Sequence, residues 1–159
     1  MNIKIILAGD GGQGIQTIAN LIVNSVFETG LYVSEIPNYG LEQRGGVSLS
    51  YLQIQDNKIV YPKFSKADIL LLLSDQAKER TQKYIGDDTM VIDVTNYESQ
   101  LKDIHKPSYN IFFLAIIAKL LISQKIIKKE TLLSLLEKKL GQKPFWLENQ
   151  EAFNKGLNN

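Results

Sequence analysis

The sequence contains no cysteine and a single histidine, His105. Without cysteine the chain can form no disulfide, offers no thiol nucleophile and cannot ligate an iron–sulfur cluster through thiolates. One histidine without cysteine argues against a zinc site, and no Ser-His-Asp set can be nominated, because any such set would depend on His105 alone. Any electron-transfer group must therefore be held by another chain. The lack of cysteine also agrees with a reducing compartment.

The sequence also lacks an excess of charge and a long apolar run. Its 18 basic and 17 acidic residues leave a net charge of +1, which gives no broad field for nucleic acid or anionic lipid. The longest apolar run, residues 111–122, is interrupted by Lys119 and is shorter than the roughly 20 residues of a spanning helix. Residues 2–8 are apolar, but Gly9 follows at once, so they read as a strand entering a loop. We expect a cytoplasmic protein.

The order of apolar segments predicts an α/β fold. Residues 3–8 form an isoleucine-rich run that is apolar apart from Lys4, which is typical of a parallel strand covered on both faces. Residues 13–28 then carry apolar side chains at helical spacing, and residues 31–36 form a second strand. Further buried strands are expected at 68–73 and 89–94. This β-α-β order predicts a three-layer α/β/α sandwich with a mostly parallel sheet.

Two regions depart from that order. Residues 47–55 alternate in polarity, and Asp56 and Asn57 form a turn leading to residues 58–61, which predicts a local antiparallel hairpin. The C-terminal part is helical instead: residues 109–122 are apolar nearly all round, and two amphipathic stretches follow at 129–140 and 145–155. Because no linker or repeat divides the chain, residues 1–159 are expected to be one domain.

The first motif lies between the first strand and the first helix. Gly9, Gly11 and Gly14 match the pattern G-x-G-x-x-G, in which glycines permit a sharp turn and the helix start offers N–H groups to an anion. Glu35 lies at the distance expected of an acid that holds the ribose of NAD. A tight turn without a ligand explains the pattern equally well. Asp10 argues against a pyrophosphate unless its carboxylate turns away.

The second motif is the loop at residues 38–46, after the second strand. Arg44 lies beside two glycines, from where its guanidinium could bind a phosphate or a carboxylate. The alternative is an ordinary loop in which Arg44 pairs with Glu42 or Asp10. Because both glycine motifs follow strands of a mainly parallel sheet, we expect them to meet at one edge of it.

Together the two motifs resemble the gamma subunit of the 2-oxoacid:ferredoxin or flavodoxin oxidoreductase family, of pyruvate, 2-oxoglutarate or ketoisovalerate type. Residues 11–14 read Gly-Gly-Gln-Gly, and residues 39–46 resemble the family's Tyr-Gly-x-Glu-x-Arg-Gly-Gly. The Tyr-Pro pair at 61–62 and the asparagine before the apolar helix also occur in the expected order. Three residues depart from the family pattern: Leu41, Gln43 and Ala115.

The resemblance implies an accessory subunit that is inactive alone. The family decarboxylates a 2-oxoacid oxidatively, transfers the acyl group to coenzyme A and passes electrons to ferredoxin or flavodoxin. Thiamine diphosphate and the iron–sulfur clusters are bound by the alpha, beta and possibly delta subunits. The gamma subunit is thought to help form the coenzyme A side of the site, with no catalytic or metal-binding residue of its own.

The site residues that follow from the motifs and the resemblance belong to the two glycine loops and to the start of the apolar helix. They are Gly11, Gly12, Gln13, Gly14, Tyr39, Gly40, Glu42, Arg44, Gly45, Gly46 and Asn110. The alternative is a free-standing, Rossmann-like dinucleotide-binding protein that uses the glycines of the first motif and Glu35. A structural interaction module with no ligand is a third possibility.

Overall fold

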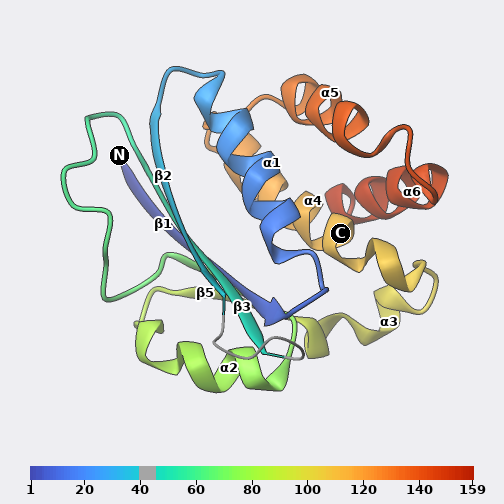
Figure 1. The fold of residues 1–159 in the computed structure, drawn as a ribbon, viewed down its shortest axis with the longest axis horizontal. Coiled ribbons are helices and arrows are strands. Elements are labelled where there is room, and N and C mark those ends of the chain that lie inside the picture. Colours follow the sequence, from blue (N-terminus) through green and yellow to red (C-terminus); the bar gives the residue numbers. More distant parts are fainter. Residues whose placement is uncertain (40–45) are drawn as a thin grey trace.

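The computed structural model describes residues 1–39 and 46–159, with Tyr39 described by its backbone alone. Within these residues one open sheet has the strand order β2-β3-β1-β4-β5 (Figure 1). The strands are β1 (Asn2–Asp10), β2 (Tyr32–Tyr39), β3 (Val47–Gln55), β4 (Ile69–Leu72) and β5 (Met90–Asp93). The four segments predicted as buried or alternating strands and the second strand are all present.

The sheet is mixed, because β3 is antiparallel to both of its neighbours. It pairs with β1 from Asp10↔Val47 to Asn2↔Gln55 and with β2 from Tyr39↔Ser48 to Tyr32↔Gln55. The ladders between β1 and β4 and between β4 and β5 are parallel. The predicted antiparallel strand therefore exists, but the sheet is less parallel than expected.

The prediction that residues 58–61 form the other strand of a hairpin is wrong. These residues are outside any strand, and β3 lies in the interior of the sheet. The physical reason is backbone pairing: β1 and β2 satisfy the hydrogen-bonding groups of β3 along its whole length, which a partner of four residues cannot do.

Helices cover both faces of the sheet, which confirms the three layers (Figure 1). One face carries α1 (Ile15–Phe27), α4 (Tyr109–Ser123), α5 (Lys129–Leu140) and α6 (Trp146–Leu157). The other face carries α2 (Asp75–Thr81) and the turn η1 (Gln82–Tyr84). The short elements η2 (Val94–Tyr97), α3 (Glu98–Leu101) and η3 (Lys106–Ser108) lead from β5 to α4.

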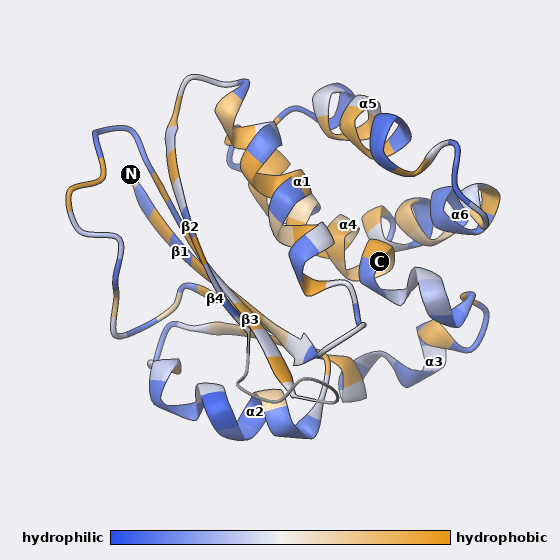
Figure 2. Cartoon of the chain, in the orientation of Figure 1, coloured by the Kyte–Doolittle hydropathy of each residue, from blue (hydrophilic) through white to orange (hydrophobic). Residues whose placement is uncertain are grey.

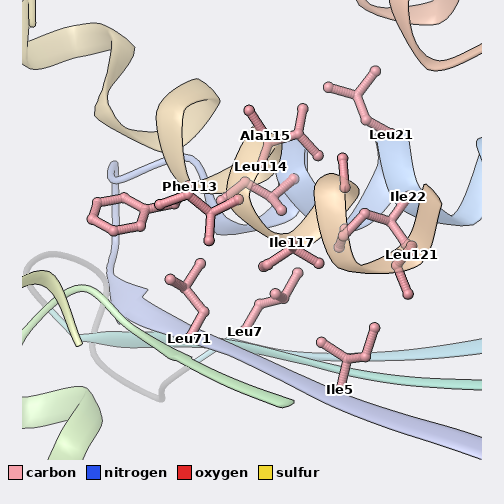
Figure 3. Packing of buried hydrophobic residues seen from close by; sticks show 14 of the residues in the cluster. Ile5, Leu7, Leu21, Ile22, Leu71, Phe113, Leu114, Ala115, Ile117 and Leu121 are labelled. Carbon is pink, nitrogen blue, oxygen red and sulfur yellow. The ribbon is translucent and has the colours of Figure 1, made fainter. Parts of the chain in front are cut away.

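The larger core lies between the sheet and α4. Ile5 and Leu7 of β1 point toward α4, and Figure 3 shows them below Phe113 and Ile117. Figure 2 shows hydrophobic residues concentrated on α1 and α4, whereas α2 is mostly hydrophilic. The stretch Lys106–Ser123 is long and apolar enough to span a membrane by composition, but 56% of it is buried in the fold. It is the core helix predicted from its all-round apolar character.

The smaller core lies on the α2 side of the sheet. Ile6 and Ala8 of β1 pack there with Leu70 and Leu72 of β4 and with Ala77 of α2. Side chains of β1 alternate between the two cores because successive residues of a strand point to opposite faces. Below, this side of the sheet is called the α2-side face.

Candidate functional site

The turn between β1 and α1 requires glycine at two positions. Gly12 has φ 91° and Gly14 has φ 80°, the left-handed region that side-chain-bearing residues rarely adopt. Gly14 is the N-cap of α1, and Ile18 N–H donates to Gly14 O at 3.1 Å as the helix begins. The G-x-G-x-x-G pattern therefore lies where it was predicted, after a strand and at the start of a helix.

Gln13 fixes this turn to the neighbouring strand. Its Oε1 accepts a hydrogen bond from Asp10 N–H at 2.6 Å, and its Nε2 donates to Leu73 O, just after β4, at 3.1 Å. Both ends of the side-chain amide are thus bonded to the protein. A direct contact of Gln13 with a ligand stays a prediction, whereas its part in holding the turn is visible.

The two glycine motifs meet at one edge of the sheet. Gly11 N–H donates to Gly46 O at 2.8 Å, and Asp10 is the register partner of Val47. The predicted meeting of the motifs is confirmed by this hydrogen bond. Tyr39 ends β2 at the same edge, opposite Ser48. Gly40, Leu41, Glu42, Gln43, Arg44 and Gly45 lie outside the described residues.

Asn110 in the first turn of α4 lies directly against Gly14. A Cβ atom on Gly14 would overlap the side-chain amide of Asn110. The structure therefore brings together two predicted site residues that are nearly a hundred positions apart in the chain. The contact also places the N-terminus of α4 beside that of α1.

A cleft of about 390 Å³ opens between these two helix starts. It is lined by Gly12, Gln13, Gly14, Leu73, Val94, Lys106, Pro107, Tyr109, Asn110 and Phe113. Lys106 was not among the predicted site residues. The only sequence signal for it was its position four residues before Asn110, at the entrance to the apolar helix.

The cleft is suited to an anion. Among the described residues, no side chain caps the N-terminus of α1 or α4, and neither first turn carries an acidic residue. Ser108, the N-cap of α4, instead donates its hydroxyl proton to Asn149 Oδ1 at 2.7 Å. The first N–H groups of α1 thus keep their partial positive charge, whereas α4 continues from η3 and its Tyr109 N–H donates to Lys106 O. Lys106 adds a full charge beside the cleft.

Asp10 does not oppose an anion in this cleft. Strand alternation places its side chain on the α2-side face with Ile6 and Ala8, and it is absent from the described lining of the cleft. Its Oδ1 is buried and has no hydrogen-bond partner among the described residues. The carboxylate has therefore turned away, which was the condition for a phosphate at this turn.

Glu35 is poorly placed for the ribose of NAD. Strand β3 lies between β1 and β2, so Glu35 is two strands away from the glycine turn. Its Oε1 accepts a hydrogen bond from Ser50 Oγ at 3.0 Å. In a dinucleotide-binding fold the acidic residue must reach a ligand that is bound at the first turn. The geometry thus gives no support to the dinucleotide-binding alternative.

No group of three His, Cys, Asp or Glu side chains that could hold a metal ion is found within residues 1–39 and 46–159. The chemistry available at the cleft is therefore hydrogen bonding and charge. Such a site can bind and orient an anionic group.

Comparison with known proteins gives a consistent result. Residues 4–159 match the family model described as pyruvate ferredoxin/flavodoxin oxidoreductase. The 2-oxoglutarate synthase subunit KorC of Methanothermobacter marburgensis is 40% identical over 80 residues, which are 48% of this chain and 42% of that subunit. The pyruvate/ketoisovalerate oxidoreductases common subunit gamma of Thermococcus kodakarensis is 33% identical over 72 residues, covering 45% of this chain and 39% of that subunit. Each match thus spans less than half of the relative.

Solved structures share the fold over nearly the whole chain. The keto/oxoacid ferredoxin oxidoreductase gamma subunit from Geobacter sulfurreducens has a TM-score of 0.70 at 21% identity, covering 98% of this chain and 96% of that one. The 2-oxoglutarate:ferredoxin oxidoreductase from Magnetococcus marinus, with 2-oxoglutarate, coenzyme A and succinyl-CoA bound, has a TM-score of 0.79 at 21% identity. That match covers 98% of this chain and 30% of the other.

Proposed function

This chain belongs to the pyruvate ferredoxin/flavodoxin oxidoreductase family, and we propose that it is the gamma-type subunit of a multisubunit 2-oxoacid:ferredoxin oxidoreductase. The complex would decarboxylate a 2-oxoacid such as 2-oxoglutarate or pyruvate oxidatively, form the acyl-coenzyme A and pass the electrons to ferredoxin or flavodoxin. Relatives that carry the names of such subunits, and a gamma subunit of the same fold, support this proposal.

The residues of this chain indicate which cofactors the other subunits must bind. With no cysteine it cannot ligate iron–sulfur clusters through thiolates, so we assign the clusters and thiamine diphosphate to the alpha, beta and possibly delta subunits. This chain contributes a binding surface and no reacting group.

We assign the cleft beside Gly14 to a phosphate of coenzyme A. The observation that carries this assignment is the meeting of the uncapped N-terminus of α1 with Lys106 and Asn110 around one cleft. Phosphate oxygens accept hydrogen bonds from the first N–H groups of a helix, and the helix dipole favours their charge. Asn110 can donate a further hydrogen bond from its amide. Glycine at 14 lets the Asn110 amide lie against the turn, which a Cβ there would prevent.

The test is steady-state kinetics of the reconstituted complex. Lys106→Gln removes the charge and is expected to raise the KM for coenzyme A about tenfold, with kcat and the KM for the 2-oxoacid nearly unchanged, because binding rather than chemistry is lost. Lys129→Gln, at the exposed start of α5, is the matched control and should behave as wild type. An unchanged KM for coenzyme A in Lys106→Gln would show that the cleft does not bind it.

A further inference from the structure

The α2-side face carries a groove that the proposed function does not use. Two hollows, of about 320 and 560 Å³, flank the segment between residues 61 and 65 and share Lys63 and Phe64. Together they are called the α2-side groove. Residues 61–65 line its outer side, which is called the outer wall; they belong to the long connection from β3 to β4 (Figure 1). Among the described residues α2 is the one regular helix on this side of the sheet.

One end of the groove is aromatic and firmly held. The ring of Tyr51 makes edge contacts with Phe64, at 6.2 Å between centroids, and with Tyr84, at 5.5 Å. Lys66 Nζ donates to Ile85 O at 2.7 Å, and Ala67 N–H donates to Tyr84 O at 2.9 Å. These bonds join the outer wall to η1, so the space between the three rings is preformed.

The aromatic end also offers hydroxyl donors. Burial is the main cause that raises the pKa of Tyr51 well above its usual range, and the neighbouring Tyr84 phenol raises it further. The charge of Arg80 and a hydrogen bond with Asn38 act in the opposite direction. The Tyr51 hydroxyl is protonated at neutral pH, as a tyrosine ordinarily is, and it lines the groove beside the Tyr84 phenol.

The other end of the groove is polar and incompletely satisfied. Gln53 is 4% exposed, and its Nε2 donates to Asn2 Oδ1 at 3.2 Å. Its Oε1 is buried without a hydrogen-bond partner among the described residues, and so is the hydroxyl of Ser34, its cross-strand neighbour. Buried polar atoms without partners are costly, and they are rare in native interiors.

The charge along the groove is positive. Lys63, Arg80 and Lys83 are exposed and form no ion pair among the described residues. The nearby acids are Asp68, which accepts a hydrogen bond from Lys4 N–H, and Glu79 beside Arg80. Basic side chains thus outnumber acidic ones at the edges of the groove.

Exposed apolar side chains extend the groove outward. Val60 is 89% exposed and Tyr61 is 71% exposed, and both precede Pro62 in the outer wall. An apolar surface next to an aromatic pocket, with a charged rim, is typical of a protein interface.

We propose that the α2-side groove receives an extended segment of a partner subunit, with an apolar or aromatic side chain between Tyr51, Phe64 and Tyr84 and a carboxylate at Lys63. This inference rests on the proposed function, since it needs a complex. The positive rim disfavours a cationic ligand and a second copy of the same face. A free anion leaves Val60 and Tyr61 without a partner.

Crosslinking identifies the chain that lies in the groove. Because this chain has no cysteine, an introduced cysteine is its one site for thiol labelling. Lys63→Cys and Lys138→Cys, labelled with a benzophenone maleimide, each carry one probe in the reconstituted complex. Illumination should join residue 63 to a larger subunit, at a peptide that contains an acidic residue near an apolar or aromatic one. The label at position 138, exposed on α5, should give no such product. A crosslink from 63 to a second copy of this chain, or no crosslink in an intact complex, overturns the proposal.

Charge reversal separates this proposal from the proposed function. Lys63→Glu should weaken association with the partner subunits about tenfold, and Lys138→Glu by less than about twofold. The KM for coenzyme A of the complex that still forms should be unchanged, since Lys63 is outside the cleft lined by Gly14 and Lys106. Undiminished association of Lys63→Glu in an active complex overturns the docking inference alone. If the wild-type chain forms no complex, both proposals fail.

Discussion

Gly14 is restricted by its backbone and by its neighbour. Its φ of 80° is in the left-handed region, and a Cβ there would overlap the Asn110 amide. Gly30 has the same φ of 80°, but a Cβ at that position would meet nothing within 4 Å. Alanine substitutions at positions 14 and 30 therefore share the free-energy cost of a left-handed backbone, and the substitution at 14 alone adds a steric clash.

Gly14→Ala should lower the free energy of unfolding by about 2 kcal/mol more than Gly30→Ala, because it adds a steric clash to a left-handed backbone cost of about 1 kcal/mol. Urea denaturation of both variants measures the difference. In Gly14→Ala/Asn110→Ala part of that excess should return, since the clashing amide is gone. Equal losses at positions 14 and 30 would refute the close contact between α1 and α4.

Asp93 at the end of β5 shows how one carboxylate joins elements. Burial opposes its ionisation, but hydrogen bonds from the Thr95 N–H and hydroxyl and from Lys78 outweigh burial, and the pKa of Asp93 lies below its usual value. The Lys78 Nζ to Asp93 Oδ2 distance is 3.1 Å, which connects α2 to β5. A carboxyl whose pKa is lower in the folded state stabilises the fold where it is ionised.

The stability from Asp93 should therefore be complete above the ordinary aspartate pKa of about 4 and be lost as the pH falls through the lower, folded-state value. Asp93→Asn should destabilise the protein at pH 7 and make a smaller difference at pH 2–3. Thermal unfolding of both proteins across this range provides the comparison. A loss that stays constant with pH would mean that Asp93 acts through packing alone.

Helices α4 and α6 approach closely because Gly156 faces α4. A Cβ on Gly156 would overlap Phe112 O and lie 2.7 Å from the Cβ of Ala115. Ala115 is one of the three residues that depart from the family pattern, in which glycine is common at this position. In this chain the glycine of α6 provides the space that Ala115 takes up.

Gly156→Ala should destabilise the protein by about 2–3 kcal/mol, since overpacking of a close helix contact displaces backbone. Ala115→Gly in the same chain should recover part of the loss, but not all, because Phe112 O is still in the way. Chemical denaturation of the single and double variants gives the coupling free energy between the two positions. Strict additivity would contradict a shared contact.

At the scale of elements, the sequence predicted most of what periodicity controls. The buried runs became β1, β4 and β5, and the all-round apolar segment became the core helix α4. The pairing partners of β3 could not be predicted in the same way. Alternating polarity indicates that a strand has one exposed face, but it does not indicate which strands lie on either side of it. In fact β3 is largely buried, and turn residues after it suggested a hairpin that pairing with β1 and β2 excludes.

The candidate site followed a similar division. The glycine pattern predicted the turn between β1 and α1, because the positive φ of Gly12 and Gly14 favours glycine. The site residues between 40 and 45 stay predictions. The roles of Lys106 and of the Gln13 amide depend on distances between segments far apart in the chain, which a single sequence does not give. The position of Lys106 at the entrance to the apolar helix was the one signal for it. Asn110 was found through the resemblance alone.

Across the whole molecule, the helices on the two faces of the sheet differ in how far they are buried. Helix α4 is surrounded by β1, α1 and α6, with nine of its residues buried, whereas α2 buries Ala77 and Thr81. Amides in an element that is buried on all sides exchange with solvent only when the whole domain opens, and amides of a thin covering element exchange by local opening.

Hydrogen exchange of the isolated chain should therefore rank the elements, with α4 and β1 slowest and α2 with the 58–66 segment much faster. In the reconstituted complex the 58–66 segment should slow while α5 does not, since the groove lies on the α2-side face and α5 on the other. Mass spectrometry of peptides from both states measures this. If α4 exchanges as fast as α2 in the isolated chain, the core does not lie where its burial places it, because a helix enclosed on every side cannot open alone.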